Sequence, residues 1–346
     1  MTIFRHPLVF LTSAFLTVMT PPTQATGFQW TEAADPGDRS LALGIWYPSA
    51  APVPAGPNTP FRQALAIKAP VEGENLPVVV ISHGYGGWLG GHADTAKALA
   101  NAGYVVVAMT HTGNNFEDNG APASRWMLDR PRHVARTVDF MLRDWPGRAH
   151  LDPARIGLFG FSAGGYTALV SVGGVPDIAG VPAYCKAHPA EYVCASGILG
   201  EIATAGVPAI PASAFVHEPR IRAAVIAAPG LGFGFEAEGL KHVRVPVQLW
   251  SGERDERVPT AENAALVRDA LPMAPEFHEV RGAGHFAFMA PCKPELRRLE
   301  PEVWAEICTD AEGFDRAAFK QDFNAAVVAF FDRTMPEGLA VSSENR

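Results

Sequence analysis

Short, continuous apolar runs recur along the chain and alternate with segments whose apolar residues fall at helical spacing. Such runs, rich in Val, Ile and Ala, are typical of strands buried on both faces of a parallel sheet. The predicted strands are residues 78–82, 104–110, 155–161, 223–228, 245–250 and 277–280. The predicted helices are residues 94–101, 133–145, 163–172, 260–271 and 315–333. This alternation predicts an α/β fold, with a mostly parallel central sheet and helices on both faces.

Three segments depart from this rhythm. Residues 28–34 and 41–47 alternate around Asp35-Pro36-Gly37-Asp38 and predict an N-terminal antiparallel hairpin. Residues 111–132 are polar and predict a loop at the carboxyl edge of the sheet. Residues 173–219 are rich in Gly, Pro and Ala and predict an insertion that forms a cap or lid over that edge. An inert surface excursion is the alternative for this insertion.

The first 25 residues have the pattern of an export signal. Arg5 precedes an apolar run over residues 8–19, which is too short to cross a bilayer, and Ala25 offers a small residue for signal peptidase. We expect cleavage near Ala25, with an uncleaved anchor as the alternative. The mature chain would then be one domain over residues 26–335, followed by a disordered tail at 336–346.

Composition limits the choice of partners. Of the 346 residues 48% are hydrophobic, which is ample for a large core. The formal net charge is -8 and no basic cluster offsets it, which argues against nucleic acid and against stable insertion into a membrane. The sequence does not indicate an oligomeric state.

Export gives the four cysteines a structural meaning, because disulfides persist in oxidising compartments. Cys185 and Cys194 lie close together in the insertion, and Cys292 and Cys308 flank a polar segment near the C-terminus. We predict these two local disulfides, although four cysteines allow three pairings. None of the spacings is that of a zinc site, so no metal is expected.

The sequence Gly160-Phe161-Ser162-Ala163-Gly164 lies between a predicted strand and a predicted helix. This GxSxG pattern is typical of a nucleophile elbow, where a sharp turn exposes the serine hydroxyl. A glycine-rich turn with an ordinary surface serine is the alternative.

A serine hydroxyl becomes a useful nucleophile when a base removes its proton and a carboxylate orients that base. In this architecture the order along the chain is Ser, acid, His, each after a strand. Ser162, Asp255 and His285 meet both conditions, and we predict them as nucleophile, acid and base. The alternatives for the acid and the base are Glu253, Glu256, His83 and His111.

A second glycine-rich loop, His83-Gly84-Tyr85-Gly86-Gly87, follows the strand at residues 78–82. Acyl transfer needs backbone donors aimed at the oxygen on which negative charge develops. We predict the amides of Tyr85 and Ala163 as these donors, with Gly86 in place of Tyr85 as the alternative. A plain turn between strand and helix is the simpler interpretation of this loop.

The motifs HGYGG, GFSAGG, GAGHF and the 252–255 loop together resemble the α/β-hydrolase superfamily over almost all of the predicted mature chain. Within it, the sequence is similar to exported bacterial hydrolases of the dienelactone hydrolase-like or platelet-activating factor acetylhydrolase-like kind. The resemblance implies a serine carboxylic ester hydrolase that needs no cofactor. Dienelactone hydrolases carry a cysteine where this chain has Ser162. Eukaryotic acetylhydrolases take their acid after the strand that here ends Ala227-Ala228-Pro229, where no carboxylate stands.

These observations predict an exported serine esterase for small uncharged esters with short or medium acyl groups. Aromatic side chains near the motifs would form the substrate pocket together with Tyr85, namely Trp88, Phe161, Phe286 and Phe288. An amidase or peptidase would use the same three residues. A catalytically silent scaffold used for binding is the alternative from a different class.

Overall fold

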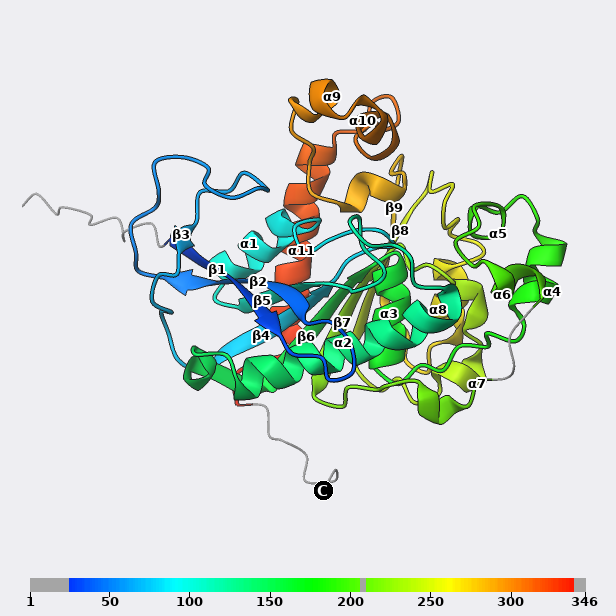
Figure 1. The fold of residues 1–346 in the computed structure, drawn as a ribbon, viewed down its shortest axis with the longest axis horizontal. Helices are drawn as coiled ribbons and strands as arrows, with labels where there is room; N and C mark the ends of the chain where they lie inside the picture. The colour runs from blue at the N-terminus through cyan, green and yellow to red at the C-terminus, as the bar shows by residue number, and fades with distance from the viewer. Residues whose placement is uncertain (1–24, 206–209, 339–346) are drawn as a thin grey trace, which may run out of the picture.

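The computed structural model describes residues 25–205 and 210–338. Within these ranges, nine strands form one sheet in the order β3-β1-β2-β5-β4-β6-β7-β8-β9 (Figure 1). The strands are β1 (Ala25–Ala33), β2 (Leu41–Ser49), β3 (Ala66–Ile67), β4 (Leu76–Ser82), β5 (Val105–Thr110), β6 (Leu151–Phe161), β7 (Ile221–Ala227), β8 (Val247–Gly252) and β9 (Glu276–Val280). Strand β2 pairs antiparallel with β1 and β5, and the other pairs are parallel. The predicted mostly parallel sheet with an antiparallel hairpin is therefore confirmed.

Strand β4 shows why the apolar runs form central strands. All seven of its residues are buried, and successive side chains point to opposite faces. Val78 and Val80 enter one hydrophobic cluster, whereas Val79 and Ile81 enter another. Each face of the sheet therefore needs its own layer of helices.

Helices supply both layers (Figure 1). Those discussed below are α1 (Ala93–Asn101), α2 (Ala123–Arg143), α3 (Ala163–Ser171), α4 (Val181–Ala187), α5 (Tyr192–Ala195), α6 (Glu201–Thr204), α8 (Ala264–Ala270), α9 (Leu296–Leu299), α10 (Pro301–Ile307) and α11 (Arg316–Thr334). Helices α2, α3 and α8 contribute to the cluster that contains Val78, and α1 and α11 to the cluster that contains Val79. Helices on both faces were predicted, and this is confirmed.

Helix α2 begins ten residues earlier than predicted, so the second half of the expected 111–132 loop is helical. Pro131 lies inside this helix and lacks the N–H that would bond to the carbonyl of Met127. The Tyr166 hydroxyl donates to that carbonyl instead, at 3.4 Å. Trp126 and Met127 are buried on the same helix. Tertiary contacts therefore extend the helix through the proline.

Both predicted disulfides are present and cross-link segments outside the sheet. Cys185–Cys194 joins α4 to α5 within the 173–219 insertion. Cys292–Cys308 closes the segment that contains α9 and α10. In the loop-closure model, each stabilises the fold by about 3 kcal/mol.

The predicted export signal spans residues 1–25, of which 1–24 lie outside the described residues. Most of the predicted tail, residues 339–346, also lies outside them. Ala25 is the first residue of β1. Cleavage after it would leave Thr26 to open the strand. Among the described residues, every helix is too short or too polar to cross a bilayer.

Candidate active site

Ser162 lies at the tight turn between β6 and α3, with φ 56° and ψ −118°. Backbone segments approach each other so closely at this turn that no side chain fits two residues before or two residues after Ser162. A Cβ added at Gly160 would lie 2.1 Å from the Gly164 carbonyl oxygen, and one at Gly164 would lie 2.0 Å from the Ser82 carbonyl oxygen. The two glycines of the motif are therefore required by packing.

Three loops bring Ser162, His285 and Asp255 into one hydrogen-bonded series. His285 Nε2 lies 3.0 Å from Ser162 Oγ, and His285 Nδ1 lies 2.7 Å from Asp255 Oδ2. The carboxylate can accept a proton but not give one, so Nδ1 donates to it and Nε2 is left to accept the serine O–H. The side chains of Asp255 and His285 are nearly closed to solvent, with residue exposures of 4% and 8%.

Asp255 is itself held in place by its own loop after β8. Its second oxygen, Oδ1, accepts the backbone N–H groups of Arg257 and Val258, both at 2.9 Å. Of the two alternative acids, Glu256 is exposed, and Glu253 is exposed and accepts the Gly282 N–H at 2.7 Å. Asp255 is the carboxylate of this loop that bonds to His285.

The alternative bases, His83 and His111, lie inside the protein and bond to other groups. His83 Nε2 accepts the His111 N–H at 3.1 Å, and His111 Nε2 lies 2.9 Å from Ser82 Oγ. Burial lowers the pKa of both imidazoles well below the usual value, with a further contribution from the nearby charge of Arg130. Both rings are therefore neutral at pH 7.

The glycine-rich loop that follows β4 passes beside the elbow. A Cβ added at Gly84 would lie 3.1 Å from the Phe161 ring and 3.4 Å from Ser162 Cβ. Tyr85 and Ala163 both border the cavity at Ser162. Within the described parts of the chain, their backbone N–H groups donate to no protein acceptor.

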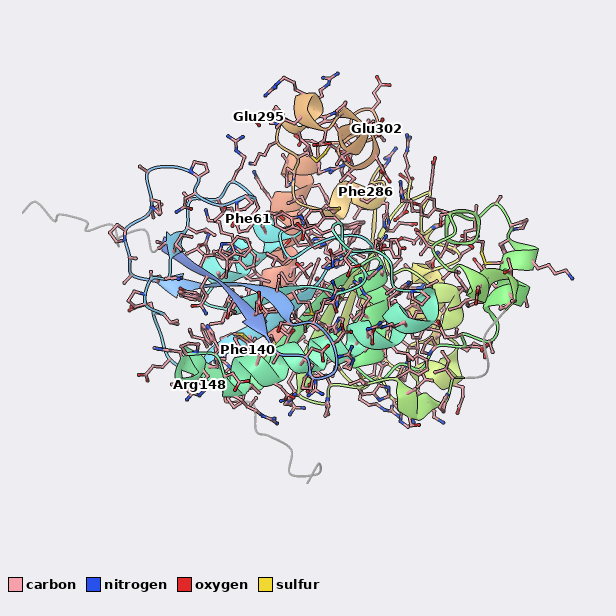
Figure 2. The ribbon with its side chains drawn as sticks, viewed as in Figure 1. Phe61, Phe140, Arg148, Phe286, Glu295 and Glu302 are labelled. Atoms are coloured by element: carbon pink, nitrogen blue, oxygen red, sulfur yellow. A yellow bond between two sulfur atoms is a disulfide. The ribbon has the colours of Figure 1, made fainter. Side chains whose placement is uncertain are left out.

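A cavity of about 390 Å³ opens at Ser162 and His285. Most of its other walls are apolar or aromatic side chains from the motif loops, from α2, from the insertion and from the C-terminal segment. They include Tyr85, Trp88, Trp126, Phe161, Tyr192, Val193, Ile198, Leu199, Phe286, Met289 and Ile307. Figure 2 shows Phe286 below the segment that carries Glu302. Residues of the 173–219 insertion thus border the cavity.

Phe288 does not line this cavity, contrary to the prediction. It is fully buried and packs against Phe319 and Phe323 of α11. Residues 285–288 form one turn of 3-10 helix, and this turn directs Phe286 to the cavity and Phe288 into the core.

Arg257 is a residue of the cavity wall that the sequence did not indicate. Its guanidinium lies over the rings of Tyr192 and Phe286, at 4.3 and 4.8 Å from their centroids. It also donates to the Tyr192 hydroxyl and, at 2.8 Å, to Glu306. Tyr192 stands two residues before Cys194, and Glu306 two residues before Cys308. Arg257 thus connects the two disulfide-linked segments.

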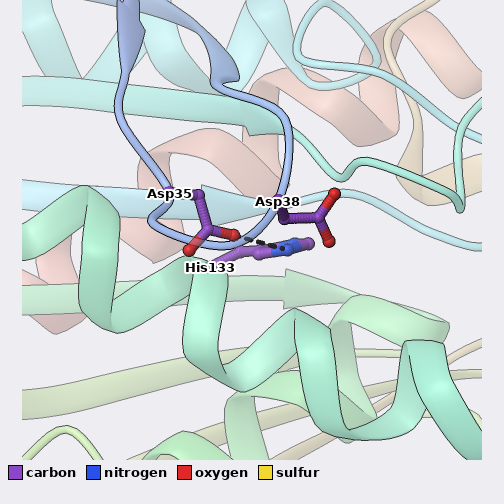
Figure 3. A group of neighbouring side chains, drawn as sticks. All are labelled: Asp35, Asp38 and His133. Carbon is purple, nitrogen blue, oxygen red and sulfur yellow. Dashed lines mark ion pairs between the residues drawn. The ribbon is translucent and has the colours of Figure 1, made fainter.

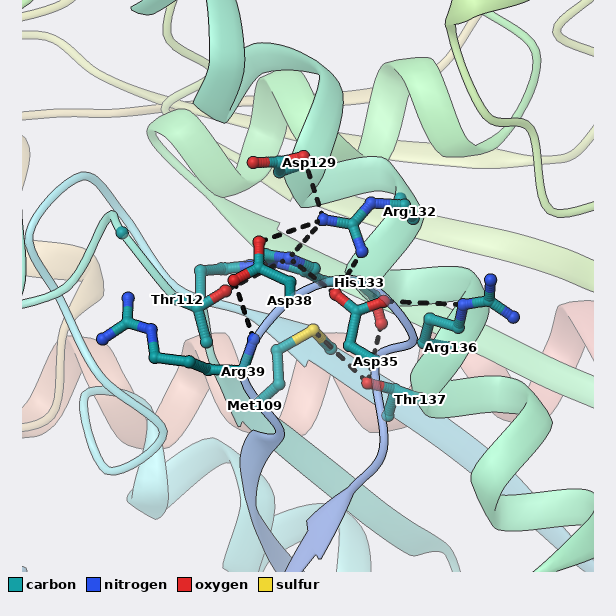
Figure 4. Close-up of polar contacts among 12 residues, drawn as sticks. Asp35, Asp38, Arg39, Met109, Thr112, Asp129, Arg132, His133, Arg136 and Thr137 are labelled. Carbon is teal, nitrogen blue, oxygen red and sulfur yellow. Dashed lines mark hydrogen bonds and ion pairs between the residues drawn. The ribbon is translucent and has the colours of Figure 1, made fainter. Parts of the chain in front are cut away.

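One group of side chains has the composition of a metal site. Ligand atoms of Asp35, Asp38 and His133 all lie within 4.8 Å of one another (Figure 3). Figure 4 shows that arginines surround these carboxylates: Arg132 pairs with both, and Arg136 Nε lies 3.6 Å from Asp35. These guanidinium groups supply the positive charge that a cation would bring. The cluster is therefore an ion-pair network that attaches α2 to the hairpin.

A mostly parallel sheet, with a serine at a strand–turn–helix junction on its carboxyl edge, defines the α/β-hydrolase fold. The model of the Dienelactone hydrolase family matches residues 61–201, so the chain is similar to this family over that segment. The match supports a carboxylic ester hydrolase. A ferulic acid esterase from Streptomyces cinnamoneus has a similar structure, with a TM-score of 0.62 over 95% of each chain. At 20% sequence identity, this likeness supports the fold alone. No curated protein matches the sequence.

Proposed function

We propose that this protein is an exported serine esterase in which Ser162 is the nucleophile, His285 the base and Asp255 the acid. The observation that carries the proposal is the continuous series from Ser162 Oγ through His285 to Asp255, with contacts of 3.0 and 2.7 Å. A nucleophile, a base within hydrogen-bond reach and a group that orients the base are the three parts that acyl transfer requires.

The proposed reaction has two halves. Ser162 Oγ attacks the ester carbonyl carbon while its proton moves to His285 Nε2. Collapse of the tetrahedral intermediate breaks the bond to the alcohol oxygen, which takes the proton from His285. Water then attacks the acyl-enzyme, with His285 again accepting a proton and returning it to Ser162. The N–H groups of Tyr85 and Ala163 are the proposed donors to the negative oxygen in both halves.

The substrate class follows from the cavity wall. Aromatic and aliphatic groups dominate it, and its Arg257 and Glu306 side chains pair with each other. A charged substrate would have to break this pair to gain an ionic partner. We therefore propose uncharged esters with short or medium acyl groups, including Trp88, Phe161 and Phe286 among the contacts.

Export and domain organisation belong to the same proposal. Two disulfides fit an oxidising compartment, and the leader predicted over residues 1–25 would deliver the chain there. The catalytic domain would span residues 26–335 with a lid at 173–219. Of the resemblances in the sequence, the one to platelet-activating factor acetylhydrolase-like proteins stays a prediction.

The test is Ser162→Ala, compared with Ser171→Ala as a matched control. Ser171 lies in α3, and its buried hydroxyl has no hydrogen-bond partner within residues 25–205 and 210–338, so its loss should leave the site unchanged. Ser162→Ala should lower kcat for p-nitrophenyl acetate by about 10⁶-fold, the loss typical of a missing nucleophile. A fluorophosphonate probe should label the parent protein and Ser171→Ala at Ser162 and leave Ser162→Ala unlabelled.

Turnover that survives in Ser162→Ala would overturn the proposal. A parent protein that hydrolyses p-nitroacetanilide at a rate comparable with the matched ester would support the amidase instead. A parent protein that neither turns over esters nor reacts with the probe would support the silent scaffold.

A further inference from the structure

Arg130 of α2 is an unusual residue in this fold because its charge is fully buried. Its side chain is 0% exposed, and among the described residues no carboxylate lies within ion-pair distance of it. Burial lowers the pKa of the guanidinium to about 9. A buried charge without a counter-charge is destabilising, so its presence needs a reason.

The hydrogen bonds of Arg130 join the two elements that border Ser162. Its NH2 group donates to the carbonyl of His83, the first residue of the glycine-rich loop. Its Nε donates to Thr167 Oγ1 at 3.0 Å, on α3. NH1 donates to Asn114 Oδ1 at 2.5 Å, and NH2 also lies 3.5 Å from Ser82 Oγ. The guanidinium is therefore a rigid link between the loop and the elbow helix.

The same network acts on the peptide group that ends in the Tyr85 N–H. His83 Nε2 accepts the His111 N–H, so the ring proton lies on Nδ1 and donates to the Gly84 carbonyl at 2.6 Å. That carbonyl belongs to the peptide group whose other end is the Tyr85 N–H. A donor at one end of a peptide group fixes its orientation and polarises the N–H at the other end.

The peptide group that ends in the Ala163 N–H is held in a similar way. Its carbonyl, on Ser162, accepts the N–H groups of Gly165 at 2.8 Å and Gly230 at 2.9 Å. The next carbonyl, on Ala163, accepts the Thr167 hydroxyl at 2.8 Å, and this hydroxyl accepts from Arg130. Both peptide groups are thus bonded at their carbonyl ends, while the two N–H groups donate to no acceptor among the described residues, and both residues border the cavity.

We infer that Arg130 is a positioning residue for the oxyanion hole: it fixes the His83–Gly87 loop against α3 so that the Tyr85 and Ala163 N–H groups converge on one oxygen. The inference rests on the proposed function, because it assigns a role within acyl transfer. Arg130 touches no substrate and acts through His83 and Thr167. A neutral side chain of similar size would fill the space but would leave the loop without this link.

The test compares Arg130→Met and Arg130→Lys with Arg125→Met. Arg125 lies on the same helix, is exposed and pairs with Asp38 and Asp129, away from the cavity. For p-nitrophenyl acetate, Arg130→Met should lower kcat by about 10- to 100-fold, less than the 10²–10³ expected when a donor itself is removed. KM should stay within about threefold, because the ground-state carbonyl depends less on these donors than the transition state does. Lysine should restore part of the rate, and Arg125→Met should behave as the parent.

Two further measurements separate positioning from general damage. The affinity for a trifluoromethyl ketone, which forms a tetrahedral oxyanion on Ser162, should fall by the same factor as kcat/KM. The preference for an ester over its thionoester should shrink, because sulfur accepts these hydrogen bonds poorly. Should Arg130→Met fail to fold, Thr167→Val removes the bond from Arg130 to α3 with little change in volume and should show both effects at about 3- to 10-fold, the loss of one or two hydrogen bonds.

Variants that fold and keep kcat, ketone affinity and thionoester preference within about twofold of the parent would overturn the inference. The inference would also be overturned if KM rose while the ratio of ketone affinity to substrate affinity stayed unchanged. In either case the parent enzyme would still react with fluorophosphonate at Ser162. Failure of this inference is thereby distinguishable from failure of the proposed function, in which the parent itself is unreactive.

Discussion

Two arginines near the candidate active site are held in opposite ways. Arg130 is fully buried behind the glycine-rich loop, with neutral partners on three elements. Arg257 stands on the cavity wall, stacked between two rings and paired with Glu306, whose side chain is 52% exposed. The region around Arg130, called the fixed region below, is held by the packing of the main core. The region around Arg257, called the adjustable region, depends on the disulfide-linked segments outside the sheet.

The difference separates two tasks. Oxyanion stabilisation needs donors placed before the reaction begins, and a buried network supplies that rigidity because each of its groups would cost free energy if it moved away. Selection among substrates needs only a wall of suitable shape, and a partly exposed ion pair contributes at most about 1 kcal/mol to holding it. The disulfides cross-link each wall segment locally, and Arg257 bonds both segments to the Asp255 loop.

Among the changes that test this comparison, the largest effect is expected at Asp255, in the same loop as Arg257. Asp255→Asn keeps the shape of the side chain but can no longer hold the proton of His285 on Nδ1 as a carboxylate does. We expect kcat for p-nitrophenyl acetate to fall about 10⁴-fold. Steady-state kinetics check this, with Glu253→Gln as the control in an exposed position nearby. A loss of less than tenfold would show that Asp255 is not the acid. The distinction between a fixed catalytic region and an adjustable cavity wall would then no longer hold for this loop.

An intermediate effect concerns the stability of the fixed region in acid. Burial lowers the pKa of His133 to about 3 in the folded protein. Below pH 6.5 the same imidazole binds a proton in the unfolded chain, whereas it stays neutral in the folded protein. Its contribution to the free energy of unfolding is complete above pH 6.5 and declines by about 1.4 kcal/mol for each pH unit below it.

His133→Gln should remove this slope. Between pH 6.5 and 5.0, urea unfolding of the parent should lose about 2 kcal/mol more than unfolding of the variant. The control is His188→Gln, which replaces a histidine at an exposed position. Equal slopes for the parent and His133→Gln would mean that His133 becomes protonated within the folded protein.

The sequence predicted the region around Arg130 in outline. Of the region around Arg257 it predicted the insertion and both disulfides, but not the contacts that join them. Continuous apolar runs and the order of Ser162, Asp255 and His285 along the chain located the sheet and the three loops, because parallel strands end at one edge. Arg130 was missed because Pro131 and the charges around it are typical of a polar loop, and their burial depends on contacts with Tyr166 and Thr167. Phe288 was misplaced because side-chain direction within a single turn depends on the surrounding core.

Arg257 was not predicted as a residue of the cavity wall for a related reason. Nothing in its own neighbourhood of the chain shows that Tyr192 and Glu306 meet it, since both contacts depend on how the disulfide-linked segments fold over the cavity. Residues at the end of a strand are located by the strand. Residues that pack against an insertion are located only by the tertiary structure.

The smallest effect is expected at Arg257 itself. Arg257→Met keeps the length of the side chain but loses the ion pair with Glu306 and the charge between the rings of Tyr192 and Phe286. Because the cavity wall would then be held less firmly, longer acyl groups should gain relative to acetate. The ratio of kcat/KM for p-nitrophenyl octanoate over acetate should rise about two- to fivefold, the factor of a partly exposed ion pair, while kcat for acetate stays within twofold. Glu306→Gln should shift the ratio in the same direction by less, because it leaves the stacking in place. If both variants kept the parent's ratio, Arg257 would not shape acyl selectivity, and the wall would be as fixed as the network around Arg130.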